Sequence, residues 1–133
     1  MVHGPIFLIA SLVGVWLFYI QHQFEGTYFE KGEKWDHMNA ALRGSSFYKL
    51  PKVLNWFTGN IGFHHIHHLS PRVPNYYLDR AHEENTMFQD VTPVTLLSSL
   101  RSLNFRIWDE NRKKLVGFGY VRRFLMARKA KGR

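Results

Sequence analysis

The sequence predicts an all-α membrane protein in which one transmembrane helix precedes a helical cytosolic region. Three observations carry this prediction. The first 24 of the 133 residues contain no Asp, Glu, Lys or Arg. A histidine-rich segment, FHHIHHL, lies between turn-forming residues near the middle of the chain. The net charge of +8 arises in the last quarter, because residues 101–133 hold 11 basic and 2 acidic side chains.

The transmembrane helix is predicted over residues 4–22. Ser11 is the only polar side chain between residues 4 and 20, and apolar side chains surround the helix instead of forming one stripe. This stretch spans roughly 26 Å as a helix, the short end of what a bilayer core requires. A buried soluble helix or a signal peptide are the alternatives, but the start lacks the cationic residues of a signal peptide. The positive-inside rule then places the basic C-terminal side in the cytoplasm.

Residues 23–100 are predicted to form part of a cytosolic cap that carries the histidines. Pro51 is expected to begin a short helix, and residues 58–62 to form a turn. On a helix, His64, His67 and His68 stand at i, i+3 and i+4, so their rings leave one face together and favour a transition metal. The alternatives are a solvated histidine cluster and a weak, non-specific metal-binding tract. Metal coordination explains why imidazoles that repel one another when protonated are kept together.

The other histidines carry weaker signals. By itself, His22 is more typical of a residue at the membrane–water border than of a metal ligand. His3, His37 and His82 have no partner at ligand spacing and are predicted to lie on the surface. The chain has no cysteine, which excludes a disulfide framework, a thiolate metal site and a cysteine nucleophile.

Two segments resemble membrane-bound fatty acid desaturases, above all the bacterial and cyanobacterial branch that acts on lipid-linked acyl chains. YKLPKVLNWFTGNIGFHHIHHLSPRVPNYYL is similar to the last histidine box of that family, and FYIQHQFE is similar to the end of its last span. The resemblance runs from about residue 5 to residue 118. It implies that His64, His67 and His68 are metal ligands of the third box and that His22 is the extra ligand outside the boxes. His65 falls between box positions and has at most a supporting role.

The resemblance also implies a fold and an activity. Family members hold a non-haem di-iron centre, bound almost wholly by histidine, in a cytosolic cap beneath four membrane helices. They use O2 and electrons from a donor such as ferredoxin or cytochrome b5 to introduce a double bond into a fatty acyl chain of a membrane lipid. The chain is therefore expected to be part of an oxidoreductase. A fatty acyl hydroxylase or oxygenase of the same superfamily and a non-catalytic, single-span metal-binding membrane protein are the alternatives.

This sequence departs from the family pattern in its first part. The earlier boxes, His-x-x-x-His and His-x-x-His-His, are absent, since His3 is the only histidine before His22. Family members are also more than twice as long and have four spans. We therefore expect the chain to be the C-terminal fragment of a desaturase and to be inactive by itself.

The last third of the chain is predicted to contain a packing helix and a basic tail. Thr92 and Pro93 are expected to start an amphipathic helix whose leucines form a packing face, namely Leu96, Leu97, Leu100 and Leu103. Residues 101–133 are predicted to form a basic cytosolic tail, either solvated or attracted to anionic lipid head groups by about 1 kcal/mol per basic residue. A nucleic-acid partner is not expected, because no binding motif or stacking signature accompanies the charge.

Overall fold

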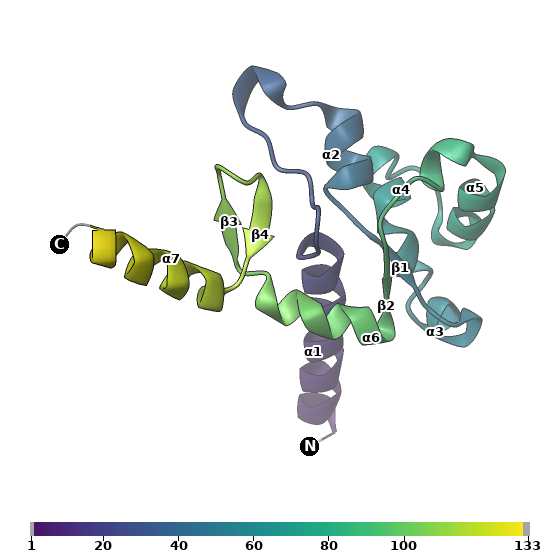
Figure 1. Cartoon of the computed structure of the whole chain (residues 1–133). Coiled ribbons are helices and arrows are strands. Elements are labelled where there is room, and N and C mark those ends of the chain that lie inside the picture. Colours follow the sequence, from purple (N-terminus) through teal and green to yellow (C-terminus); the bar gives the residue numbers. More distant parts are fainter. Residues whose placement is uncertain (1, 132–133) are drawn as a thin grey trace.

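The computed structural model describes residues 2–131 and shows one long helix whose C-terminal half meets a larger, mostly helical region built from shorter elements (Figure 1). The N-terminal half of α1 (His3–His22) projects away from the rest of the chain. We call residues 23–100 the cap. The predicted helical character is confirmed.

The elements after α1 are η1 (Gly32–Lys34), α2 (His37–Arg43), β1 (Phe47–Lys49), α3 (Lys52–Phe57), η2 (Ile61–Phe63), α4 (His64–Leu69), η3 (Asn75–Tyr77), α5 (Leu78–Glu84), η4 (Thr86–Phe88), β2 (Pro93–Thr95), α6 (Leu96–Ser99), η5 (Leu100–Asn104), β3 (Ile107–Asp109), β4 (Lys114–Val116) and α7 (Phe118–Lys131), where η denotes a 3-10 helix.

Among the described residues, α1 is the one helix long and apolar enough to cross a membrane. Its most apolar window has a mean hydropathy of 1.8, yet only 6% of that window is buried. A core helix of a soluble protein would be covered on most sides, so the exposure of α1 argues against that alternative. Its last turn contributes Ile20 to a core cluster of the cap, an arrangement that a cleaved signal peptide would not make.

Two small cores hold the cap together around the end of α1. The first joins Ile20 and Phe24 to Tyr48 of β1 and Val94 of β2. The second packs α4 against α5 and consists of Phe63, Ile66, Leu78 and Phe88. Because one core contains the end of α1 and the other contains α4, their packing fixes the distance between the two histidine-bearing elements.

The strands add two features to the predicted helical fold. β1 and β2 pair in parallel, with Tyr48 opposite Val94, and the chain between them contains α3, α4 and α5. Parallel strands need such a crossover connection, and here the crossover carries the histidine segment. β3 and β4 form an antiparallel hairpin within the stretch predicted to be a tail, and its Trp108 lies 5.4 Å from the ring of Phe29. Residues 101–131 are therefore folded against the cap at their start and continue into α7.

The prediction of a packing helix over residues 91–103 is wrong in two respects, namely the residue at which the helix starts and the face that it turns toward the protein. Pro93 lies in β2, and the helix begins later, where Thr95 and Ser98 form a capping box. Ser99 and Ser102 are buried, whereas the four leucines are exposed. The reason is hydrogen bonding: the hydroxyl of Tyr19 donates to the Ser102 carbonyl at 3.1 Å, and the buried hydroxyl of Tyr48 donates to that of Ser99 at 3.4 Å. The polar face therefore meets the protein.

Candidate metal centre

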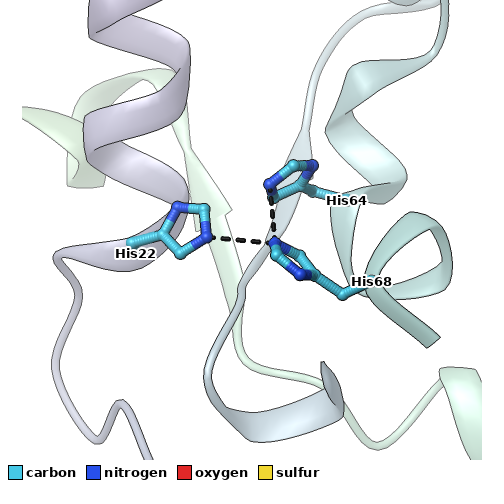
Figure 2. A group of neighbouring side chains, drawn as sticks. All are labelled: His22, His64 and His68. Atoms are coloured by element: carbon cyan, nitrogen blue, oxygen red, sulfur yellow. Dashed lines mark hydrogen bonds between the residues drawn. The ribbon is translucent and has the colours of Figure 1, made fainter. Parts of the chain in front are cut away.

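Three histidine side chains from two helices converge beside the end of α1. His22 is the last residue of α1, and His64 and His68 are separated by one turn of α4 (Figure 2). The Nε2 atom of His68 lies 3.1 Å from Nε2 of His22 and 3.0 Å from Nε2 of His64. Ligand atoms of all three residues lie within 4.8 Å of one another. Two of the three are 46 positions apart in the sequence, so only the tertiary fold brings them together.

A tight turn between α3 and α4 orients the histidine helix. Gly59 and Asn60 both adopt positive φ, at 62° and 58°, which is a conformation that glycine and asparagine tolerate best. The amide of Asn60 donates to the carbonyl of Asn75 at 2.9 Å and ties this turn to the segment that precedes α5. The turn predicted over residues 58–62 is confirmed, and it lets α4 start at His64.

Gln21 links α1 to the same turn and is a site residue that the sequence analysis missed. Its side chain is fully buried, and its Nε2 donates to the carbonyl of Ile61 at 2.7 Å. The backbone carbonyl of Gln21 accepts from the Ser46 amide at 2.9 Å. The sequence did carry a signal for it, since Gln21 and His22 are a polar pair at the end of an otherwise apolar helix. A glutamine that is buried at such a position needs hydrogen-bond partners.

The tautomer of His22 follows from its other nitrogen. Nδ1 lies 2.9 Å from the carbonyl oxygen of Phe18, one turn earlier in α1. Because a carbonyl only accepts, Nδ1 carries the hydrogen, and in the neutral ring the lone pair is on Nε2, the atom that points at His68. A backbone carbonyl bonded to the far nitrogen is the usual support of a metal-binding histidine. The last turn of α1 also carries partial negative charge, which favours a cation there.

His64 and His68, the two histidines of α4 that belong to the cluster, are held in their neutral form. Burial, followed by repulsion from the neighbouring imidazoles of His68, His22, His67 and His65, lowers the pKa of His64 to about 3. Burial also lowers the pKa of His68, with smaller contributions from His22 and His67. A neutral imidazole is the form that ligates a metal, so both rings are ready to bind at neutral pH.

The cluster fits a transition-metal ion. Adjacent ligand nitrogens at about 2.1 Å from one metal lie about 3 Å apart when they subtend a right angle, and the two Nε2 separations here match that spacing. Three imidazoles suit iron, zinc, copper or nickel, whereas calcium and magnesium prefer oxygen ligands. Three protein ligands on one side would leave coordination positions for further groups, as in catalytic sites.

The remaining histidines lie outside this group of three. His67 is exposed, and its ring stacks on that of His64 with centroids 5.8 Å apart, so its role as a ligand stays a prediction. His65 is fully buried on the other side of α4, where its Nε2 lies 3.3 Å from Nδ1 of His82. His82 is half-buried against the ring of Phe47, and the prediction that it lies on the surface is wrong, because α5 packs against α4. His3 and His37 are exposed, as predicted.

Comparison with known proteins decides the family. The sequence model of the family described as "Fatty acid desaturase" matches residues 1–92, more than half of the chain. The chain belongs to the fatty acid desaturase family. A fatty acid desaturase of Bacillus subtilis (strain 168) is 57% identical to it over 122 residues, which is 92% of this chain and 35% of that protein. A chloroplastic omega-6 fatty acid desaturase of Glycine max is 36% identical over 55 residues, 41% of this chain and 13% of that protein. No solved structure matches the chain significantly.

This desaturase chain spans about a third of the length of the Bacillus relative and less of the plant one. The match covers α1 and the whole histidine segment, and the longer alignment includes most of the basic region. The family and the exposed apolar α1 together indicate a membrane protein. The resemblance found in the histidine segment is thereby confirmed.

A Gly62→Ala substitution is expected to destabilise this desaturase chain and to displace α4. An added Cβ would collide with the backbone carbonyl of Tyr48 and press on the side chain of Asn55. Overpacking against backbone costs about 1–3 kcal/mol of unfolding free energy, which thermal unfolding followed by circular dichroism would detect. Gly119→Ala in α7 is the matched control, since nothing lies near its Cβ. Equal melting temperatures for both variants would contradict the close approach of η2 to β1.

Proposed function

We propose that the chain is the C-terminal part of a fatty acid desaturase, an oxidoreductase that introduces a carbon–carbon double bond into an acyl chain of a membrane lipid. The observation that carries the proposal is the convergence of His22, His64 and His68 on one point. These residues come from the two segments that resemble the ligand-bearing segments of the family, and no local periodicity places His22 beside the other two. The convergence therefore supports a metal centre assembled by the tertiary fold.

The proposed cofactor is a non-haem di-iron centre. His22, His64 and His68 would hold one iron, and His67, exposed beside them, is available for the second together with histidines supplied by the preceding part of the longer protein. When bound and reduced by a donor such as ferredoxin or cytochrome b5, this centre would supply the O2-dependent removal of two hydrogens from adjacent methylene groups. Two electrons and two protons would complete the reduction of O2 to two molecules of water. A side-chain base alone cannot do this, because an unactivated C–H bond is not acidic.

An apolar groove along α1 supports a lipid acyl chain as the substrate. The groove has a volume of about 560 Å³ and ends at His64. Val13, Gly14 and Leu17 form part of its α1 wall, and Phe57 and Ile61 form part of the opposite wall. An acyl chain that enters from the bilayer would lie along this wall with its methylene groups near the ligand cluster. The apolar lining would orient the acyl chain and exclude water. The residues of the groove would therefore contribute substrate binding and placement.

The orientation in the membrane follows from charge and is part of the proposal. The basic side chains after residue 100 would lie in the cytoplasm, as the positive-inside rule requires. The histidine cluster lies on the same side as the C-terminal end of α1, so a soluble electron donor would reach it from the cytoplasm. The C-terminal region would then contact anionic lipid head groups without any nucleic-acid partner.

A chimera tests the proposal. The matching C-terminal portion of the Bacillus subtilis desaturase would be replaced by this chain, and total fatty acids of cells that express the chimera would be analysed by gas chromatography and mass spectrometry. We expect unsaturated fatty acids from the chimera and a loss of at least about 100-fold with His64→Ala or His67→Ala, because metal ligands act as a unit. His37→Ala is the matched control and should retain activity.

Other outcomes of the chimera would contradict the proposal. Hydroxylated fatty acids in place of unsaturated ones would assign the chain to a hydroxylase. Full activity of the His64→Ala and His67→Ala chimeras would remove the metal centre from the proposal. An inactive chimera that binds no iron, although it accumulates in the membrane, would indicate that this chain cannot complete the centre.

A further inference from the structure

Two segments that lie far apart in the sequence expose large apolar side chains at the same level of α1. In α3, Trp56 and Phe57 are 75% and 72% exposed, and in α6 Leu97 is 83% exposed. Leu100 and Leu103 of η5 are exposed as well. Figure 1 shows α3 and the α6–η5 helix at a similar height beside α1, with α2, α4 and α5 on the side away from the N-terminus. We call α3 and α6–η5 together the apolar belt.

The belt lines grooves along two opposite faces of α1. Phe57 shares a groove with Val13, Leu17 and other residues of one face. Leu103 shares a second groove, of about 500 Å³, with Leu12, Val15 and Trp16. At 100° per residue these two sets of α1 residues lie on opposite sides of the helix. The belt therefore flanks α1 on two sides at a level where α1 is itself exposed and apolar, and the grooves join the apolar side chains of the belt to those of α1.

The charge of the belt distinguishes it from an ordinary protein–protein surface. Lys52 and Arg101 are exposed within it, and Arg106 is exposed just after its end. Residues 50–78 and 91–108 contain no Asp or Glu. Exposed leucine and aromatic side chains, flanked by cations and free of anions, are the composition of helices that lie in a membrane interface. The α6–η5 helix also runs across α1 instead of along it, as a helix parallel to the bilayer plane would (Figure 1).

We infer that the apolar belt lies in the interface of the bilayer that α1 crosses, with its leucines and aromatic rings among the acyl chains and its cations at anionic head groups. This arrangement accounts for the inverted α6–η5 helix, whose serines face the protein and whose leucines face outward. Helices of this kind sink about 5–10 Å into the boundary between head groups and acyl chains. That depth would also bring the opening of the groove that ends at His64 to the lipid. The inference needs α1 to be in a membrane but does not depend on desaturase activity.

Site-directed fluorescence in vesicles tests this inference, because the chain has no cysteine. Single-cysteine variants Trp56→Cys and Leu97→Cys would carry an environment-sensitive nitrobenzoxadiazole label, and Met38→Cys is the matched control. Met38 is an apolar residue of α2, 52% exposed, and α2 lies far from the N-terminal half of α1 (Figure 1). In phosphatidylglycerol–phosphatidylcholine vesicles, acyl-chain spin labels should quench the belt labels at least about threefold more than the control label, and aqueous iodide should quench the control more.

Each other outcome overturns the inference. Belt labels as accessible to iodide as the control would place the belt in water. Belt labels shielded from both quenchers would show that protein covers it, such as a preceding segment of the longer desaturase or a second copy of the chain. Ser99→Cys checks the arrangement of the helix with a thiol reagent that dissolves in the bilayer, since this buried position should react at least about tenfold more slowly than Leu97→Cys, which faces the acyl chains. Equal rates would contradict the inverted face.

Discussion

A His68→Ala substitution is expected to lower the affinity of the chain for Co²⁺ at least about 100-fold. His68 is the ligand whose Nε2 lies within 3.1 Å of both other Nε2 atoms, so its removal leaves His22 and His64 without a common partner. Co²⁺ is a suitable probe because imidazole ligands give it visible absorption bands. A titration of the chain in detergent, followed through these bands, would measure the change in dissociation constant.

His37→Ala is the control for this titration. His37 is exposed on α2, and its ring lies against Trp35 instead of the cluster. We expect its removal to leave the Co²⁺ affinity unchanged. If His37→Ala and His68→Ala weakened binding equally, the histidines would act as a non-specific metal-binding tract, which is the alternative that the sequence left open.

The metal-free chain is expected to lose at least about 4 kcal/mol of unfolding free energy when the pH falls from about 7 to about 5. Burial lowers the pKa values of His64 and His65 from 6.5 to about 3 in the folded chain. Below pH 6.5 the unfolded chain binds protons that the folded chain does not, so protonation favours unfolding. The effect amounts to about 2 kcal/mol for each histidine at pH 5. Thermal unfolding in detergent with a chelator present, followed by circular dichroism, would measure it.

A second variant separates this effect from general acid sensitivity. His65→Phe removes one of the two buried imidazoles at a position surrounded by Phe47 and Phe88. Between pH 7 and pH 5 the variant should lose about 2 kcal/mol less unfolding free energy than the original chain. Equal stability at both pH values in the original chain would contradict the neutral, buried state of the two histidines.

Local patterns in the sequence predicted the elements that carry the site. The absence of charge before residue 25 predicted α1, and the histidine spacing predicted that His64 and His68 share a face of one helix. The addition of His22 to this pair required the resemblance to a family, since no spacing rule relates residues in different helices. The proximity of the three histidines was thus predicted from two kinds of information, one local and one not.

Long-range contacts account for what the sequence did not predict. β1 and β2 have three residues each, too few to show an alternating pattern, and their pairing is non-local. The spacing of the leucines in α6–η5 showed which residues share a face but not whether that face meets protein or lipid. His82 was assigned to the surface because its partner, His65, lies 17 residues away.

The separation of His22 and His68 along the chain also affects how the protein is held together. A metal ion bound by both residues would close a loop of 46 residues, in the manner of a cross-link. In the chain-entropy description, a cross-link of that length reduces the freedom of the unfolded chain by about 4 kcal/mol. Iron would then act as a structural cross-link between the end of α1 and the cap. In cells short of iron, a larger share of the protein would be in the metal-free form, which proteases degrade faster. Iron supply would then affect the amount of the protein as well as its chemistry.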